Sequence, residues 1–244
     1  MSTTRNLFRQ RIRKAVALVR TPSAWRYVRS GVLPGVEHGE VPFDPNIKTV
    51  LDVGAARGQF ALFALDRWPA ATIYCFEPLP GPAAQLATLA PSRVHVTIAA
   101  LGDTSGQAAM HLSGRGDSSS LLPIGDRQVR EFPETRETGT ELVTVTTLDE
   151  VIDPDELAAP VLLKIDVQGG ELAVLRGAGS VLDRIDEIYV ECAFVELYAG
   201  QPLASDVISF LLAAGFQLRG VFNLVRGVDK TCLEADMLFR QTTG

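Results

Sequence analysis

Short apolar runs recur along the chain from residue 49 onwards, separated by polar turns and helical patterns. Seven runs have the length and composition of strands, at 50–53, 73–76, 94–101, 161–167, 187–192, 216–222 and 235–240. Helical patterns begin at Gly58 and cover 80–90 and 206–214. The run that begins at Val161 is interrupted only by Lys164 before its end, as expected for a strand covered on both faces. The alternation predicts a doubly wound α/β fold with a seven-stranded, mostly parallel sheet that ends in an antiparallel hairpin.

The middle of the chain departs from this alternation and predicts an added β-hairpin. Asp103 opens a tight turn that leads into an outer strand at 108–112, where a helix would normally follow. A second outer strand is predicted at 142–146. Between the two, 114–122 is a polar loop rich in glycine and serine, and 123–140 is irregular and charged. Composition alone favours a surface loop for 114–122.

The stretch 49–78 predicts a nucleotide-type unit of strand, turn, helix and strand. Gly54 and Gly58 let the backbone approach a ligand closely, and Glu77 ends the second strand, where a carboxylate can accept both hydroxyls of a ribose. The turn lacks the central glycine that a dinucleotide pyrophosphate requires, and Asp52 would repel that group but suits the ammonium of a bound amino acid. The turn therefore looks like the D-x-G-x-x-x-G motif of S-adenosylmethionine-dependent methyltransferases. An ordinary strand-to-helix turn is the alternative.

A second group of acidic residues follows the central strands. Asp166 ends one strand, and in an open parallel sheet it would meet Asp52 and Glu77 at the edge formed by the carboxyl ends of the strands. Glu191, near the end of the next strand, lies beside the same edge. Glu171 opens the following helix, where the helix dipole favours a negative charge, so it has a structural explanation as well as a catalytic one.

Charge is spread unevenly over the 244 residues. The net charge is −6, but residues 1–30 hold eight of the 23 Lys and Arg and no acid, which leaves 15 basic against 29 acidic residues in the remainder. Because nucleic-acid binding depends on Lys and Arg contacts with phosphates, the acidic body argues against a nucleic-acid substrate. The cysteines Cys75, Cys192 and Cys232 are scattered and fall in predicted strands, so we expect reduced thiols and a cytoplasmic protein.

Residues 1–48 are expected to form a basic N-terminal extension, a helix and then a linker, ahead of a methyltransferase domain at 49–244. In 5–20, apolar residues recur at helical spacing with arginines between them. This pattern fits peripheral contact with an anionic membrane, packing on the protein's own domain, or a homodimer interface. The segment does not have the apolar run of a membrane span or a secretory signal. The proline-containing segment 31–47 is expected to be a linker or a lid over the site.

Several segments together carry a family resemblance. They are VLDVGAARGQFAL, FEPLP, AALGD, SSSLL, VTTLDEVI, LLKIDVQGGELAVLRGA and YVECAFVELYAGQ. Over about residues 49–239 they resemble the FkbM family of methyltransferases, with KIDVQG-x-E as the most specific segment. The resemblance implies the class I methyltransferase (Rossmann-like) fold and transfer of a methyl group from S-adenosylmethionine to oxygen, typically to a hydroxyl of a sugar or polyketide.

The resemblance also implies which residues bind the cofactor, and it makes 114–122 part of the cofactor or substrate pocket. Cofactor binding is expected from Asp52, Gly54, Ala55, Gly58, Phe60, Glu77, Pro78, Ala100, Asp103, Ser119 and Asp166. Asp103 has two explanations, because an acid after the third strand can meet an adenine amino group but also commonly opens a turn. The basic N-terminal segment lies outside the resemblance and inherits no role from it.

Methyl transfer requires alignment of the acceptor oxygen with the methyl carbon and removal of the hydroxyl proton. Asp166 is the first candidate for the base and Glu191 the second, with His111 and His95 as alternatives because histidine titrates near neutrality. A magnesium ion bridging Asp166, Glu191 and a sugar diol is a further option, although no ligand spacing fixes it. Lys164 shares a face with Asp166, so it would pair with a carboxylate or extend out of the sheet.

Other classes share parts of this pattern. A nicotinamide-dependent dehydrogenase would have the same turn and Glu77, but Asp52 and the missing central glycine disfavour it. A non-catalytic binding protein would keep the pocket but would not need Asp166 and Glu191. A nucleic-acid methyltransferase would be expected to carry an N-P-P-Y-like tetrad, which the sequence lacks. The sequence therefore predicts a small-molecule O-methyltransferase that acts on a glycosyl or polyketide hydroxyl.

Overall fold

The computed structural model describes Val32, residues 35–89 and residues 92–242. The predicted basic helix at 5–20 lies outside these residues, so its membrane, packing and dimer alternatives remain predictions. No helix within the described residues is long and apolar enough to cross a membrane.

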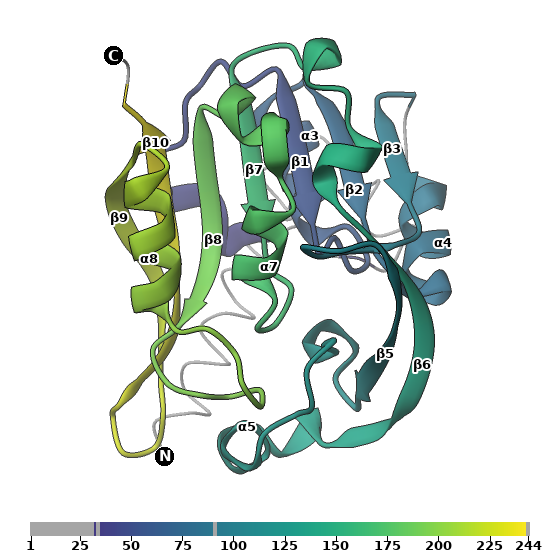
Figure 1. Ribbon diagram of the computed structural model, residues 1–244, viewed down its shortest axis with the longest axis vertical. Coiled ribbons are helices and arrows are strands. Elements are labelled where there is room, and N and C mark those ends of the chain that lie inside the picture. Colours follow the sequence, from purple (N-terminus) through teal and green to yellow (C-terminus); the bar gives the residue numbers. More distant parts are fainter. Residues whose placement is uncertain (1–31, 33–34, 90–91, 243–244) are drawn as a thin grey trace.

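A seven-stranded sheet with the strand order β3-β2-β1-β7-β8-β10-β9 forms the centre of the fold (Figure 1). Its strands are β1 (Thr49–Val53), β2 (Thr72–Phe76), β3 (Val94–Thr97), β7 (Val161–Ile165), β8 (Glu187–Ala193), β9 (Phe216–Arg226) and β10 (Cys232–Gln241). Neighbouring strands pair in parallel, except that β10 pairs antiparallel with both β8 and β9. The strand order reverses between β1 and β7, which is where an open sheet of this kind binds its ligand. The predicted sheet and its C-terminal hairpin are confirmed.

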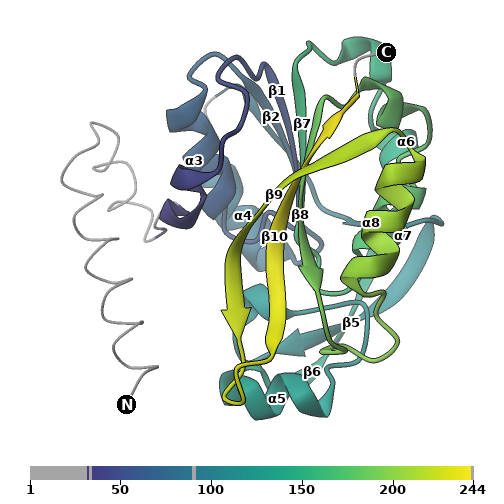
Figure 2. The same ribbon diagram turned by 90° about the vertical axis from the view of Figure 1, so that its left-hand side faces the viewer.

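Helices cover both faces of this sheet, with α3 and α4 on one face and α6, α7 and α8 on the other (Figure 2). The helices are α3 (Gln59–Arg67), α4 (Pro80–Leu89), α5 (Asp126–Glu131), α6 (Leu148–Val151), α7 (Glu171–Arg176) and α8 (Ala204–Ala213), with short 3-10 helices η1 (Val36–Glu40), η2 (Gly116–Ser118), η3 (Pro133–Thr135), η4 (Pro154–Glu156) and η5 (Gly179–Arg184). In β1, Leu51 and Val53 pack into the core beneath α7 and α8, whereas Val50 packs into the core beneath α3. This two-sided cover explains why the central strands are apolar on both faces.

A second, three-stranded sheet of order β4-β6-β5 extends beyond the carboxyl ends of the parallel strands (Figure 1). It consists of β4 (Ala100–Leu101), β5 (Gly106–Ser113) and β6 (Glu137–Thr146), and it contains the predicted added hairpin. The single strand predicted over 94–101 is wrong, because the strand in the main sheet ends at Thr97. Ala100 and Leu101 pair in parallel with β6 instead, so the chain changes sheets between these residues.

The segment 123–140, which we predicted to be irregular, also contains regular structure. It holds all of α5 and the first four residues of β6. Residues 137–140 are exposed and show no alternation of apolar side chains, but their backbone pairs with β5. Backbone pairing across the hairpin, rather than side-chain burial, therefore sets their conformation.

Residues 35–47 pack on the face of the sheet that carries α3. Val41, Phe43 and Ile47 are buried in the core around α3. Nε1 of Trp68 donates to the carbonyl oxygen of Asp44 at 2.9 Å. This part of the predicted linker is thus packed into the core of the domain.

Candidate active site

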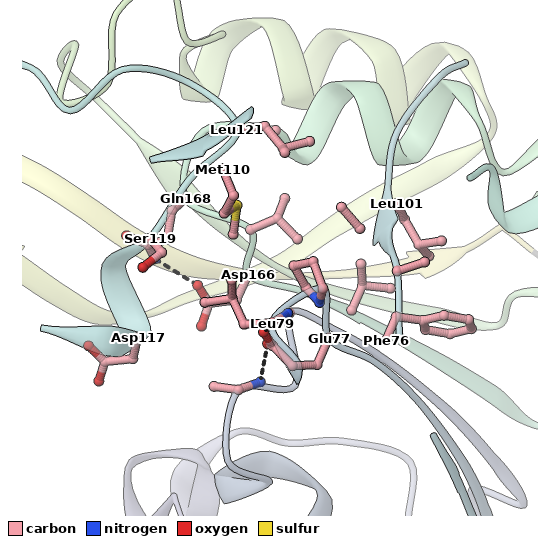
Figure 3. A pocket seen from close by; sticks show the side chains of 18 of the residues that line it. Phe76, Glu77, Leu79, Leu101, Met110, Asp117, Ser119, Leu121, Asp166 and Gln168 are labelled. Atoms are coloured by element: carbon pink, nitrogen blue, oxygen red, sulfur yellow. Dashed lines mark hydrogen bonds between the residues drawn. The ribbon is translucent and has the colours of Figure 1, made fainter. Parts of the chain in front are cut away.

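A cavity opens at the carboxyl ends of β1, β2 and β7, between these strands and the three-stranded sheet (Figure 3). It encloses about 630 Å³ of empty space, part of it open to solvent. The cofactor residues predicted from the sequence that line it are Gly54, Glu77, Pro78, Ala100, Ser119 and Asp166. Residues 116–121 form one wall, so the glycine- and serine-rich loop contributes directly to the cavity.

The turn after β1 brings its backbone against the end of β7. Gly54 has a φ of +76°, and a Cβ atom at this position would lie 1.9 Å from the carbonyl oxygen of Asp166. The amides of Gly54 and Ala55 both donate to the carbonyl oxygen of Phe76, at 3.1 Å each. Gly58, with a φ of +94°, precedes the first residue of α3. Both glycines are required by the positive φ, and Gly54 also by the close approach of two strand ends.

The Glu77 carboxylate is held in a fixed orientation at the end of β2. Its Oε2 accepts from the amide of Ala56 at 3.0 Å, and its Oε1 accepts from the amide of Leu79 at 2.9 Å. Burial raises the pKa of Glu77 above its ordinary value, although the two amides act in the opposite direction. Each carboxylate oxygen can accept a further hydrogen bond, so both can receive a hydroxyl of a ribose.

Most of the remaining cavity wall is apolar. The apolar side chains come from the end of β2, the turn before α4, the three-stranded sheet and the loop after β5. They are Phe76, Leu79, Leu101, Met110 and Leu121 (Figure 3). Apolar walls with a few fixed polar groups are typical of sites for flat heterocycles. This wall suits an adenine ring whose ribose is held at Glu77.

Lys164 joins the ends of β1 and β7 beneath the cavity. Its Nζ lies 3.3 Å from Oδ1 of Asp52 and 3.6 Å from Oδ2 of Asp166, and it donates to the carbonyl oxygen of Gly54 at 3.1 Å. Burial lowers the pKa of Lys164, but the charges of Asp52 and Asp166 outweigh it and raise the pKa above its ordinary value. Burial also raises the pKa of the fully buried Asp52, against the effect of the ammonium group. In this geometry the partner of Asp52 is Lys164.

Glu191 stands at the end of β8, and a glutamine connects it to Asp166. Nε2 of Gln168 lies 2.8 Å from Oδ1 of Asp166 and 2.7 Å from Oε2 of Glu191. Glu191 lines a smaller pocket next to the cavity, together with Gln168 and Tyr198. Burial raises the pKa of Glu191 well above its ordinary value, and the charge of Asp166 adds to this shift. Of these two acids, Asp166 is the one that lines the main cavity.

The magnesium site considered from the sequence does not form in this arrangement. Within the part of the chain that the structure describes, no group of three or more His, Cys, Asp or Glu side chains could hold a metal ion. The amide nitrogen of Gln168 occupies the position between Asp166 and Glu191. Hard cations such as magnesium bind oxygen atoms, and an amide NH₂ group offers none.

The two histidines considered as bases lie away from the cavity. Met110 lines the cavity, and since successive side chains of a strand point to opposite faces, His111 points away from it. Nδ1 of His111 lies 3.0 Å from a carboxylate oxygen of Glu137. His95 is exposed and stacks on Tyr74, with ring centroids 5.0 Å apart. Neither histidine is among the residues that line the cavity.

Five of the predicted cofactor residues lie outside the lining: Asp52, Ala55, Gly58, Phe60 and Asp103. Asp103 is exposed in the turn between β4 and β5. Phe60 is buried in the core beneath the site, where the Nζ atom of Lys164 lies 5.9 Å from the centre of its ring. Phe60 can therefore act on the site through Lys164, and direct cofactor contacts of Phe60 and Asp103 remain predictions.

The cavity also contains residues that we did not single out from the sequence. The backbone amide of Ala56, which has a φ of +46°, fixes Glu77. Met110 enters from the outer strand, and Gln168 lies in the KIDVQG segment. Gln168 lies within the most specific motif of the family, which could have indicated that it belongs to the site. The alternation of residues in β5 did not indicate that Met110 would be on the face toward the cavity.

Glu171, at the start of α7, has a structural role in the turn after β7. Its Oε1 accepts from the amides of Val167 at 3.3 Å and Gly169 at 2.9 Å. Burial raises its pKa from the ordinary value to about 7, against the effect of these amides. The folded protein therefore binds this proton more tightly than the unfolded chain does. The contribution of the group to stability is present below the unfolded pKa and is lost as the pH rises to about 7.

Replacement of Glu171 by glutamine should increase thermal stability at about pH 8 and leave it nearly unchanged at about pH 5. Glutamine keeps an oxygen for the two amides but carries no buried charge. The expected gain at the higher pH is about 2–3 kcal/mol in the free energy of unfolding, or roughly 5 °C in Tm. Calorimetric unfolding of both proteins at both pH values measures it. Equal differences in Tm at the two pH values would show that Glu171 does not titrate in this range.

Comparisons with known proteins identify the family of this chain. The profile of the methyltransferase FkbM domain matches residues 52–218. The chain is 30% identical over 241 residues to the 2-O-methyltransferase NoeI of Sinorhizobium fredii, with 96% of this chain and 93% of that protein covered. It is 32% identical over 182 residues to the 31-O-demethyl-FK506 methyltransferase FkbM of Streptomyces tacrolimicus, with 64% of this chain and 69% of that protein covered.

A solved structure agrees with the architecture. M. capricolum TrmK, in complex with S-adenosylhomocysteine, superposes with a TM-score of 0.51 at 6% identity, and the match covers 87% of this chain and 70% of that chain. At this identity the similarity concerns the fold alone, and the class I methyltransferase fold predicted from the sequence is confirmed. With the family profile spanning most of the domain, the chain belongs to the FkbM family and is an S-adenosylmethionine-dependent methyltransferase.

Proposed function

We propose that this enzyme transfers the methyl group of S-adenosylmethionine to a hydroxyl oxygen of a glycosyl or polyketide acceptor. The observation that carries the proposal is the position of Asp166, whose carboxylate lines the same cavity as the ribose-type carboxylate Glu77. A carboxylate at the reacting end of the cofactor cavity is suited to take a proton from a hydroxyl. Both relatives are named for methyl transfer to oxygen, at a 2-O and a 31-O position.

The residues that would hold the cofactor follow from the cavity. Glu77 would accept the ribose hydroxyls, the apolar wall around Met110 would contact the adenine, and the turn at Gly54 would lie along the amino-acid portion. When bound, S-adenosylmethionine supplies an electrophilic methyl group on a sulfonium that is itself a good leaving group. The protein must then position the acceptor and remove one proton, and positioning can contribute several kcal/mol to the rate.

Asp166 is the base in this proposal, and Lys164 supports it. The ammonium group of Lys164 lies 3.6 Å from Asp166 Oδ2 and pairs with that carboxylate. Glu191 is the second candidate, reached through Gln168. We include no metal step, because the described carboxylates are already bridged by an amide. A cytoplasmic location and a division between an extension at 1–48 and a domain at 49–244 stay as testable proposals.

The proposal is tested by following label from methyl-tritiated S-adenosylmethionine into a panel of acceptors. The panel holds p-nitrophenyl glycosides of neutral hexoses and deoxyhexoses and a hydroxylated macrolide, each assayed with magnesium and with EDTA. We expect label in at least one acceptor, at an oxygen identified by mass spectrometry and NMR, and equal rates with and without magnesium. Deoxy analogues lacking that hydroxyl serve as the matched control and should take up no label. Label on nitrogen or carbon, or none in any acceptor, would refute the proposal.

A further inference from the structure

Gln168 adopts a backbone conformation that its side chain does not favour. Its φ is +58°, and it is followed by Gly169 with a φ of +104°. A residue with a Cβ atom is strained in the left-handed region, where glycine is not. Strain of this kind persists where the surrounding structure determines it, and it is concentrated at functional sites. The strained backbone therefore indicates that the side chain of Gln168 has a function.

The side-chain amide of Gln168 and its backbone carbonyl oxygen make hydrogen bonds at the edge of the site. Its Nε2 donates to Asp166 Oδ1 at 2.8 Å and to Glu191 Oε2 at 2.7 Å. Its Oε1 accepts from the hydroxyl of Tyr198 at 2.7 Å, and its carbonyl oxygen accepts from the hydroxyl of Ser120 at 2.6 Å. The Tyr198 hydroxyl oxygen also lies 3.0 Å from the carbonyl oxygen of Ser118, but its one proton is used in the shorter contact with Gln168.

These contacts fix the orientation of the amide. Only one of the two flip orientations of the amide satisfies these hydrogen bonds. In it, the amide oxygen accepts from Tyr198 and both amide hydrogens point to carboxyl oxygens. A flipped amide would place its oxygen against two carboxylates and its hydrogens against a hydroxyl. The amide gives one oxygen of each acid, Asp166 after β7 and Glu191 in β8, a hydrogen-bond partner.

We propose that Gln168 is a positioning residue for methyl transfer, which holds the carboxylates of Asp166 and Glu191 in one arrangement at the mouth of the cofactor cavity. The proposal rests on the proposed function, in which Asp166 is the base. Gln168 lines both the cavity and the smaller pocket that contains Glu191, so it is the side chain shared by the two spaces. It acts through Asp166 and takes no proton itself.

The test compares the unaltered protein with Gln168→Gly and Gln168→Met. Glycine relieves the backbone strain at the positive φ and removes the amide, whereas methionine keeps the volume of the side chain and removes its hydrogen bonds. Lys230→Gly is the matched control, because Lys230 also has a positive φ, of +67°, but lies in the exposed turn between β9 and β10. Calorimetric titration with S-adenosylhomocysteine and thermal unfolding show whether each variant keeps its fold.

The first readout needs no acceptor. Crystal structures of the unaltered protein and of Gln168→Gly, both with S-adenosylhomocysteine, should show the Asp166 carboxylate rotated out of its original position in the variant. Asp166 and Glu191 with the same side-chain conformations in both structures would overturn the proposal. This comparison decides the role of Gln168 even if no acceptor in the panel is methylated, an outcome that would count against the proposed function alone.

The second readout is steady-state kinetics with the p-nitrophenyl glycoside or macrolide that the unaltered protein methylates fastest. Both Gln168 variants should lose kcat by about 10- to 100-fold with KM for S-adenosylmethionine within about threefold, because a misplaced base slows the chemical step. Lys230→Gly should keep kcat. A kcat within about twofold of the unaltered protein, or a loss of kcat matched by an equal loss of cofactor affinity, would show that Gln168 is structural.

Discussion

Replacement of Glu77 by alanine is expected to weaken the binding of S-adenosylhomocysteine by about 100-fold, because hydrogen bonds to a charged acceptor contribute about 1.5–3 kcal/mol each. The carboxylate is held by the amides of Ala56 and Leu79 before any ligand arrives. Little ordering is therefore needed when the ribose hydroxyls bind, and most of the interaction is available as affinity. Calorimetric titration of the variant and the unaltered protein measures the change.

Glu141→Ala is the control for this experiment. Glu141 is an exposed carboxylate on β6, so the same chemical change occurs in the same domain but outside the cavity. Its affinity for S-adenosylhomocysteine should match that of the unaltered protein. A Glu77→Ala protein that stays folded and binds within about threefold of the unaltered protein would place the ribose elsewhere.

Replacement of Asp166 by asparagine is expected to reduce kcat by about 100-fold or more, the range that a positioned general base contributes. The amide has almost the same shape and its oxygen can still accept from Gln168, so cofactor affinity should change by no more than about threefold. Lys164 retains Asp52 as an ionic partner, which limits any loss of stability. Initial rates with the best acceptor, together with titration by S-adenosylhomocysteine, separate chemistry from binding.

Glu191→Gln distinguishes the two candidate bases. It changes the acid that lines the neighbouring pocket and leaves Asp166 at the cavity. If Asp166 is the base, Glu191→Gln keeps a larger fraction of kcat than Asp166→Asn does. Full activity in Asp166→Asn together with loss of activity in Glu191→Gln would transfer the role to Glu191.

The convergence of the strand ends on one cavity could be predicted because the topology of the sheet determines it. In a parallel sheet, the ends of β1, β2 and β7 meet at one edge, so residues that follow these strands must converge. Gly54, Glu77 and Asp166 are residues of this kind, and all three line the cavity. Gly54 has its positive φ and lies close to Asp166 because the chain turns directly after β1, where the end of β7 is adjacent.

Residues outside those strand ends could not be placed from the sequence. His111 and Met110 are neighbours in one strand, and only the packing of the three-stranded sheet decides which of them faces the cavity. Asp52 belongs to the same motif as Gly54, but its carboxylate pairs with Lys164 in the core below the site. Gln168 takes a left-handed conformation without being glycine or asparagine, so propensity gave no sign that its amide would bridge two acids.

We propose that the cavity between β1, β2, β7 and the three-stranded sheet binds the cofactor with its ribose at Glu77 and its sulfur toward Asp166. A crystal structure of the unaltered protein with S-adenosylhomocysteine tests it most directly. We predict both ribose hydroxyls within about 3 Å of the Glu77 carboxylate, the adenine against Met110, and the sulfur nearer to Asp166 than the ribose is. A nucleoside bound outside this cavity, or a ribose without contact to Glu77, would contradict the account.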